Sequence, residues 1–299
     1  MSLAVERNAR VAMKRDGNAR ISAAIGWTGS LLALLAALAV LVAIFGFVLV
    51  HGIPALQPSI FMTVTSGVAG GLANAILGTL LLVATGVALV IFVGVGTGIW
   101  LHQYAPIGIV GTTLRFLSDV LAGVPSIVIG YFGYAVLVQR LGWQFSLAAG
   151  AIALALVMLP YVVRGTDRSL ASVPRALSEG SYALGATRAQ TLFAVEFPYA
   201  LPSIVTSLLL ASGIALGETA PLIYTAGWSN YLPSLALTHE PVGYLTYVVW
   251  TFISQPFAAS HALAYAAAVV LIVLIFTTNV VARLVLASFA RRTRGSSGT

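Results

Sequence analysis

The sequence predicts an all-α integral membrane protein with six membrane-spanning helices. Hydrophobic residues make up 59% of the 299 residues and charged residues only 8%, far from the usual composition of soluble domains. A helix needs about 20 apolar residues to cross a hydrocarbon core of about 30 Å. Six stretches are long enough, and we expect the spans near 25–50, 72–100, 113–138, 145–163, 201–225 and 262–287.

The basic residues flank the apolar stretches and concentrate on one side of this topology. Most of them lie in three segments, 1–24, 164–200 and 283–299. Positive residues accumulate in cytoplasmic loops, so we expect a multi-pass protein of the inner, or plasma, membrane with both termini in the cytoplasm. The net charge of +7 then reflects topology. We expect no nucleic-acid partner, because the basic residues form no stripe with interleaved aromatic residues.

Four segments organise the chain. Residues 1–24 form a cytoplasmic leader, and residues 25–71 hold the first span and an outer loop. The apolar run after the leader is too long for a cleaved signal peptide, so we predict a retained first helix. Residues 72–287 form a core of five spans, and residues 288–299 form a disordered cytoplasmic tail. The outer loop at 226–261 is rich in Trp, Tyr and Pro, which suits a membrane interface.

The composition argues against chemistry carried by this chain. Cysteine is absent, and the four histidines show no metal-ligand spacing. No nucleotide-binding motif and no arrangement of nucleophile, base and orienting group is recognisable. We therefore expect no metal, no cofactor and no enzyme activity. Asn74, Thr79 and Thr85 in the second span are expected to form hydrogen bonds between helices.

The segment at about 164–200 is the one sizeable cytoplasmic loop, and its sequence predicts two short helices joined by an elbow. Ser172 is placed to cap the first helix, and Pro174 falls near its first turn, where a missing N–H does no harm. Gly185 is placed to end this helix in a left-handed conformation. The loop is therefore expected to be folded.

The second helix of the loop begins at a predicted capping box formed by Thr187 and Gln190, and Pro198 is expected to end it. Two interpretations fit this pattern. An amphipathic hairpin can rest on lipid headgroups, or the same hairpin can dock a soluble partner. The spacing alone leaves both open.

The loop resembles the EAA loop of permease subunits in binding-protein-dependent ABC importers. Glu179 is followed by small residues, Gly180 and Ser181, then by Gly185 six positions later and Pro198 nineteen positions later. This sequence replaces both alanines of the family pattern. The resemblance extends through "GVPSIVIGYFGY" at 123–134 and "GETAPLIYTAG" at 217–227, which are similar to phosphate-importer permeases of the PstA type.

This resemblance implies a type I ABC importer (MetI-like) permease fold with a cytoplasmic helix-elbow-helix coupling loop. It implies a permease subunit of an ATP-driven phosphate importer that forms half of the translocation pathway. The implied partners are a homologous second permease, two copies of a cytoplasmic ATPase, and an extracytoplasmic phosphate-binding protein. The residues that the resemblance suggests for contact with the ATPase are Ser178, Glu179, Tyr182, Ala183, Leu184 and Gly185.

Glu218 is an acidic residue well inside an otherwise apolar span, where an unpaired charge costs about 2–4 kcal/mol or more. We assign Glu218 and the adjacent Thr219 to the translocation pathway or gate. The alternative is a carboxyl group that hydrogen-bonds a neighbouring helix, at a turn that Pro221 breaks. Because a carboxylate repels phosphate, Glu218 is expected to anchor a partner cation, to act protonated or to organise the turn. Relatives carry an arginine one turn earlier, where this chain has Ile214.

Arg115 and Asp119 lie one helical turn apart near the inner end of the third span, and the spacing predicts that they pair with each other. The pair either neutralises itself at the interface or forms part of an inner gate. Pro125 is expected to bend the helix just beyond them, and we place Ser126 in the pathway.

Three rival functions remain open on the sequence. The chain could be a type I ABC permease for another solute such as molybdate. It could be a membrane scaffold or sensor for phosphate signalling that transports nothing. A proton-coupled secondary transporter that uses Glu218 is a third possibility, although it leaves the elbow loop unexplained.

Overall fold

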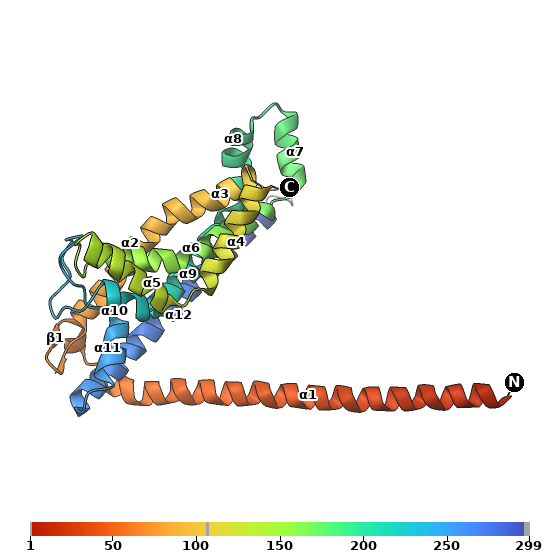
Figure 1. Cartoon of the computed structure of the whole chain (residues 1–299), viewed down its shortest axis with the longest axis horizontal. Coiled ribbons are helices and arrows are strands. Elements are labelled where there is room, and N and C mark those ends of the chain that lie inside the picture. The colour runs from red at the N-terminus through yellow and green to blue at the C-terminus, as the bar shows by residue number, and fades with distance from the viewer. Residues whose placement is uncertain (1, 106–107, 296–299) are drawn as a thin grey trace. The chain divides into compact units, whose positions relative to one another are not determined.

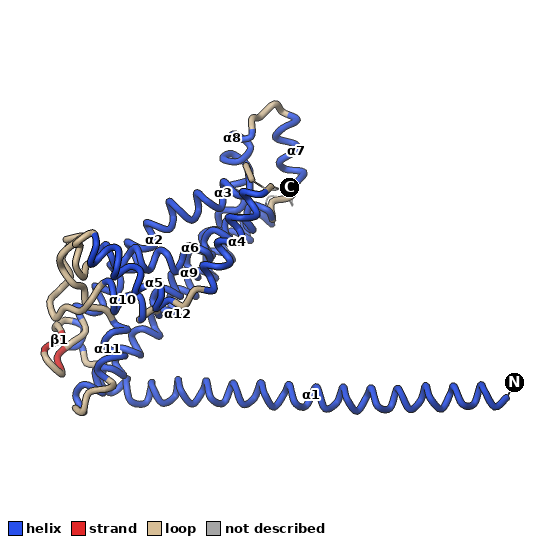
Figure 2. The backbone as a smooth tube through the Cα atoms, viewed as in Figure 1, coloured by secondary structure: helices blue, strands red, loops and turns tan. Residues whose placement is uncertain are grey.

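The computed structural model describes residues 2–105 and 108–295, and the side chains of 23 and 25–288 within them. Helices dominate, as the sequence predicts (Figures 1 and 2). The chain divides into two compact units, residues 1–50 and 51–299. The charged side chains of the leader, and those of the tail beyond residue 288, lie outside the described side chains.

The first unit is formed by helix α1, Ser2–Gly52, whose last two residues belong by sequence to the second unit. Within α1, Ile25–Ala55 is long and apolar enough to cross a membrane, which matches the predicted first span. Its apolar side chains are exposed, with Trp27 at 79% and Val42 at 68%. A helix that is apolar on all sides has no water-facing side, so its surroundings must be lipid or other protein.

A short segment without a long helix opens the second unit. It contains two 3₁₀ turns, η1 (Ile53–Ala55) and η2 (Pro58–Phe61). A two-stranded antiparallel hairpin follows, β1 (Thr65–Ser66) with β2 (Ala69–Gly70), in which Thr65 pairs with Gly70. Among the described residues this hairpin is the one departure from helix and loop.

The second span is one long helix that contains a π turn. It comprises α2 (Ala73–Val90), η3 (Ile91–Val95) and α3 (Gly96–Gln103), and these run on as a 31-residue candidate span. Asn74 and Thr79 are buried and bond other segments: Asn74 Nδ2 donates to Ser229 O at 2.8 Å, and Thr79 Oγ1 accepts from Leu245 N–H at 2.9 Å. The predicted bond between helices is confirmed for Thr79, which reaches α11, whereas Asn74 bonds a loop carbonyl and Thr85 bonds its own helix.

The third span is broken and not continuous. Helix α4 (Ile109–Gly123) is followed by α5 (Ser126–Gly133) and the π helix η4 (Tyr134–Arg140), and the axis bends by 97° at the break. Val124 has a ψ of 126°, because a residue before proline is forced into extended conformations. Pro125 itself is also outside the helical region, with a ψ of 133°. The bend at Pro125 is confirmed. The described residues thus contain five candidate spans, or six when this bent pair counts as one.

Helix α6 (Leu147–Ala171) lies at the centre of the unit and is mostly buried. Beyond it come α7 (Arg175–Ala183), α8 (Arg188–Thr191) and the π helix η5 (Leu192–Glu196), which continues directly into α9 (Phe197–Gly217). Helix α6 extends past the predicted end of the fourth span. The loop is accordingly shorter than the expected 164–200.

Three further helices complete the chain. Helix α10 (Ala220–Thr225) follows a break at Glu218–Thr219, α11 (Leu245–Phe252) lies between two loops, and α12 covers Ala258–Gly295. Because α12 is helical to Gly295, the expectation of a disordered tail from residue 288 is wrong for residues 288–295. The last four residues lie outside the described part.

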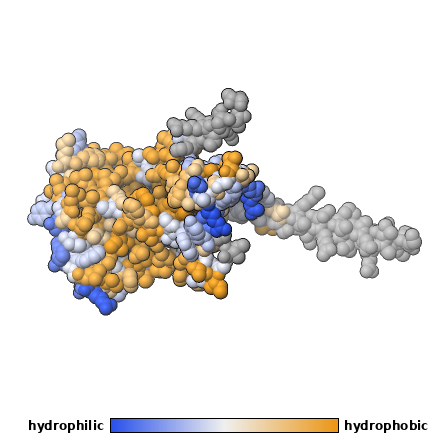
Figure 3. Space-filling view, turned by 90° about the horizontal axis from the view of Figure 1, so that it is seen from above, coloured by the Kyte–Doolittle hydropathy of each residue, from blue (hydrophilic) through white to orange (hydrophobic). Residues whose placement is uncertain are grey.

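Packing around α6 holds the unit together. Helices α2 and α9 pack on α6, and α12 packs on α9 and α11. Leu154 and Met158 of α6 are fully buried beside Leu82 of α2 and Ile204 of α9. The segment 226–257, which the sequence predicts to be an outer loop, is more than an interface loop, since Leu245 and Val248 of α11 are fully buried in a second apolar cluster. Apolar residues also cover most of the visible face of the unit (Figure 3), as a lipid environment requires.

Candidate coupling loop and broken spans

Helices α7 and α8 form a hairpin that projects beyond the other helices at one end of the second unit (Figure 1). The hairpin turns at Gly185, which has φ of +84°. The Gly185 N–H donates to Tyr182 O at 2.9 Å, and the Ala186 N–H donates to Ser181 O at 3.2 Å. These two bonds form the Schellman arrangement that closes a helix end. The predicted left-handed elbow is confirmed.

The capping box at the start of α8 is also confirmed. Thr187 Oγ1 accepts from Gln190 N–H at 3.3 Å, and Gln190 Oε1 accepts from Thr187 N–H at 2.8 Å. Two donors at the helix start are thereby satisfied reciprocally. The sequence identified this start correctly because all the groups involved are within three residues.

Two other assignments in the loop are wrong. Ser172 does not cap α7: it ends α6, and its Oγ donates to Ser169 O at 2.7 Å. The reason is that α6 runs on to Ala171, which leaves Pro174 at the start of α7 without a side-chain cap. Pro198 does not end the second helix, since Arg188–Gly217 is a single 30-residue candidate span. Pro198 lies in the first turn of α9, directly after the π helix η5.

The proposed ATPase contacts divide into two groups. Leu184 is 91% exposed and Tyr182 42% exposed, and Glu179, Ala183 and Gly185 are also exposed. Ser178 instead turns back toward the membrane helices, where its Oγ donates to Glu196 Oε1 at 2.7 Å. Five of the six residues are therefore available to a partner, and Ser178 holds α7 in place.

Glu196 is a residue that the sequence reasoning missed. It is only 6% exposed, and its Oε2 has no hydrogen-bond partner among the described residues. A buried carboxyl group with one unsatisfied oxygen is costly, so it marks a position with a specific role. The available signal was an acidic residue in "FAVEFP", within a helix that was expected to lie on the membrane surface.

Arg115 and Asp119 do not pair with each other, contrary to the prediction. Arg115 Nε contacts Asp167 Oδ2 at 2.9 Å, and its Nη2 contacts Oδ1 at 3.3 Å. Asp119 pairs with Arg164. Both partners lie on α6, so the two ion pairs join α4 to α6. A two-point contact between guanidinium and carboxylate is stronger and more directional than an exposed pair along one helix.

Arg115 also secures the end of α3. Its Nη1 donates to Ala105 O and its Nη2 to Leu101 O, each at 3.1 Å. Carbonyl groups at a helix end have no partner within the helix, and a cation there interacts favourably with the helix dipole. The signal for this cluster in the sequence was the pair Arg164 and Asp167, three residues apart, which mirrors Arg115 and Asp119.

Glu218 and Thr219 form the break between α9 and α10. Both are half-buried, and Glu218 has extended backbone with ψ of 132°. The Thr246 hydroxyl donates to Glu218 O at 2.8 Å, which ties the break to α11. The Glu218 carboxylate has no hydrogen bond or ion pair with any described residue. The predicted broken helix is confirmed.

Ser126 opens α5 at the other break, and α5 packs against α10. A Cβ at Gly130 would collide with Pro221 of α10, and one at Gly133 would collide with Thr225. These contacts show that α5 and α10 run parallel. Arg115 and Asp119 lie elsewhere, on α4 beside the last turns of α6.

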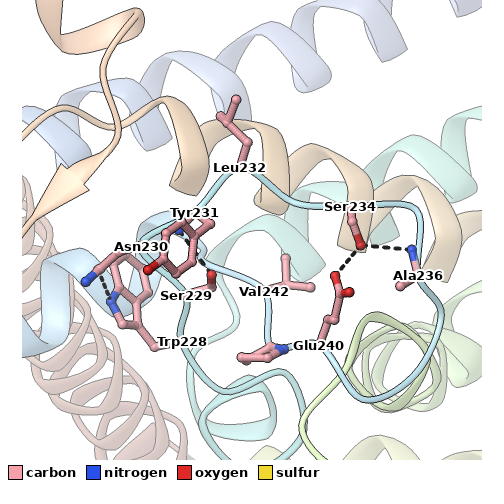
Figure 4. A pocket seen from close by; sticks show the side chains of 10 residues that line it. Trp228, Ser229, Asn230, Tyr231, Leu232, Ser234, Ala236, Glu240 and Val242 are labelled. Carbon is pink, nitrogen blue, oxygen red and sulfur yellow. Dashed lines mark hydrogen bonds between the residues drawn. The ribbon is translucent and has the colours of Figure 1, made fainter.

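A cavity of about 580 Å³ lies in the loop that follows α10 (Figure 4). Asn230 Oδ1 accepts from Trp228 Nε1 at 2.8 Å, and Ser234 bonds Glu240. The Trp228 ring stacks on Tyr247, with centroids 4.5 Å apart. In the described part of the chain, no three His, Asp or Glu side chains are grouped as metal ligands.

The arrangement of helices is that of a known class of transporter subunit. The structure superposes on a chain of the MetNI methionine ABC transporter, in an inward-facing conformation, with a TM-score of 0.60. The match covers 72% of this chain and 95% of that chain at 20% identity. The chain therefore has the MetI-like fold of type I ABC importer permeases.

The chain belongs to the family described as the binding-protein-dependent transport system inner membrane component, whose model matches residues 94–295. The phosphate transport system permease protein PstA 2 of Mycobacterium bovis is 44% identical over 236 residues, which cover 79% of this chain and 78% of the relative. The probable ABC transporter permease protein YqgI of Bacillus subtilis is 33% identical and covers 87% and 92%. The resemblance to PstA-type permeases is confirmed.

Proposed function

We propose that this permease carries phosphate: it forms half of the pathway of an ATP-driven phosphate importer and couples that pathway to a cytoplasmic ATPase. The observation that carries the proposal is the 44% identity, over most of both chains, to a relative named as a phosphate transport permease. The exposed elbow at Gly185 supports coupling, because a permease without a nucleotide-binding motif must take its energy from a partner.

The loop can transmit movement of an ATPase to two spans. Helix α7 follows α6 after three residues, and α8 continues through η5 into α9 without interruption. Force applied to Glu179, Tyr182 and Leu184 would therefore reach the ends of α6 and α9 together. The hydrogen bond from Ser178 to Glu196 adds a direct link between α7 and the start of the long helix. Rigid elements of this kind suit a two-state transporter.

The pathway is proposed to pass the two breaks. Discontinuous helices frequently form substrate sites in transporters, because irregular backbone is tolerated there only beside protein or water. Ser126, Glu218 and Thr219 are therefore our candidates for pathway residues. Since the Glu218 carboxylate has no partner among the described residues, we propose that it forms an ion pair with a cationic side chain of the second permease. Arg115 and Asp119 act as a clamp at the loop end, where they can limit the opening of α4 from α6.

The partners follow from the family. We propose a homologous second permease, two ATPase copies, one of which docks at the α7–α8 hairpin of this chain, and an extracytoplasmic phosphate-binding protein at the opposite end, near the loop of Figure 4. The distribution of Lys and Arg along the sequence supports placing the hairpin and both termini in the cytoplasm. Pocket and hairpin then lie on opposite sides of the membrane.

The test is phosphate uptake into vesicles that contain this chain, the second permease, the ATPase and the binding protein. We expect uptake that requires ATP and is lost when Gly185 is replaced by Trp. If molybdate competes for uptake better than phosphate does, the cargo is molybdate and not phosphate. Uptake without ATP would indicate a secondary transporter, and an assembled complex without flux would indicate a scaffold or sensor.

A further inference from the structure

A cleft of about 480 Å³ lies near the α7–α8 hairpin, and its walls are α6, α9 and α12. Helix α6 lines it with Tyr161, Arg164, Gly165, Arg168 and Ser169, and Ser172 follows directly after this helix. Helix α9 adds Ser203, Thr206 and Ser207, and α12 adds Leu286. Ser172 directly precedes the α7–α8 hairpin. The cleft thus lies at the base of the proposed coupling loop.

The cleft is basic. Arg164 and Arg168 are one turn apart on α6, so their side chains lie on the same face. Arg164 shares its charge with Asp119, whose side chain is 55% exposed. Arg168 is exposed and has no hydrogen bond or ion pair with any described residue. Asp167, the neighbouring acid, is held by Arg115. None of the lining residues is acidic, so a net positive charge faces the cleft.

Hydroxyl groups form the opposite wall and the floor. Ser169, Ser172, Thr206 and Ser207 each donate to a carbonyl of their own helix, and such a hydroxyl can rotate toward a better acceptor. The Ser203 hydroxyl makes no hydrogen bond in the described part of the chain. Gly165 allows α9 to pack closely against α6, since a Cβ there would collide with the Ser207 side chain.

We propose that this cleft binds a tetrahedral oxyanion of the phosphate class. A guanidinium fork matches phosphate oxygens, and hydroxyl donors across the cleft complete a polar shell. Two sources supply this chemistry: free inorganic phosphate and the phosphate of an anionic lipid headgroup. The ring of Tyr161 and the side chain of Leu286, which also line the cleft, would suit the acyl chains of a lipid.

A bound oxyanion would link α6 to α9, the two helices from which the hairpin extends. It would therefore stabilise one arrangement of these helices and restrict movement of the hairpin. This inference does not depend on the cargo proposed above, because the ligand acts at the base of the loop whatever solute passes the breaks.

The experiment uses the full chain in nanodiscs of phosphatidylcholine, with thermal unfolding followed by tryptophan fluorescence. Inorganic phosphate is titrated against chloride at equal ionic strength, and a second series replaces part of the lipid with phosphatidic acid. The variants are Arg168→Gln and Ser203→Ala. Arg140→Gln is the matched control, because Arg140 is exposed and lies at the opposite end of the broken span.

We expect either ligand to raise the unfolding temperature of the unmodified chain and of Arg140→Gln. In Arg168→Gln the apparent affinity should fall by about tenfold or more, as the loss of one charged hydrogen bond predicts. Ser203→Ala, which removes only an exposed hydroxyl, should weaken binding less. A response to free phosphate identifies the soluble ion as the ligand, and a response only to phosphatidic acid identifies the headgroup. No stabilisation by either, or equal stabilisation of Arg168→Gln and the control, would overturn the proposal.

Discussion

Ser178 Oγ lies 2.7 Å from Glu196 Oε1, and this bond joins the exposed helix α7 to the buried start of the long helix that becomes α9. The two residues are eighteen positions apart, on opposite sides of the Gly185 elbow. The Ser181 and Thr191 hydroxyls, 2.9 Å apart, form a second link across the same hairpin. These two bonds tie α7 to α8 and to the start of the long helix that follows.

Replacing Glu196 with Ala is expected to loosen α7 and to lower the phosphate transported per ATP hydrolysed. The change removes the acceptor of the Ser178 hydroxyl and should cost about 1–3 kcal/mol of stability. The measurement is uptake and ATP hydrolysis in the same vesicles. Glu196→Gln is the control, since it keeps an acceptor oxygen without a buried charge. Wild-type coupling in Glu196→Ala would contradict the proposed link.

Replacing Gly185 with Trp should leave the chain inserted but abolish stimulated ATP hydrolysis. The left-handed conformation costs a residue with a Cβ about 1–2 kcal/mol. The ring would occupy open space where a partner is expected, since no described residue other than the two chain neighbours lies within 4 Å of a Cβ at this site. Gly185→Asn is the matched control because Asn tolerates this conformation better. Normal hydrolysis in the Trp variant would exclude the elbow from the ATPase contact.

A double-mutant cycle should show that Arg115 is coupled to Asp167 and not to Asp119. We expect Arg115→Gln and Asp167→Asn each to destabilise the chain by about 1–2 kcal/mol, with clear non-additivity. Arg115→Gln combined with Asp119→Asn should be nearly additive. The measurement is thermal or denaturant unfolding in detergent. Strong coupling of Arg115 with Asp119 would instead favour a pair along one helix.

Replacing Glu218 with Gln should leave folding intact and lower uptake severalfold. Its carboxylate has no partner among the described residues, and the contact that ties the break to α11 uses its backbone oxygen. Thr246→Val, which removes that contact, is the complementary variant and should cost about 1 kcal/mol of stability. Unchanged transport by Glu218→Gln would remove Glu218 from the pathway.

Replacing Tyr244 with Phe should be neutral or slightly stabilising. Tyr244 is 1% exposed, and its hydroxyl has no hydrogen-bond partner among the described residues, so removing it leaves no new unsatisfied group. Burial, and then the nearby Tyr247, raise the pKa of Tyr244. Stability should therefore fall above about pH 10, where the unfolded chain loses this proton and the folded chain keeps it. Unfolding as a function of pH should show a smaller alkaline loss in Tyr244→Phe.

Local features of the chain were predictable. The apolar runs indicated a membrane protein because only a helix satisfies its own backbone in lipid. The elbow at Gly185 and the capping box at Thr187 were predictable because every group in them is separated by only a few residues. The same holds for the bends at Pro125 and Glu218, where proline excludes helical geometry nearby.

Tertiary packing decided the rest. The sequence offered Arg115 the adjacent Asp119, but the fold brings Asp167 of another helix into two-point contact. It carries the helix past Pro198 through a π turn, and it buries Glu196 beneath Ser178. Local spacing determines where a helix starts, turns or breaks, whereas the partner of a charged side chain depends on which helix packs beside it.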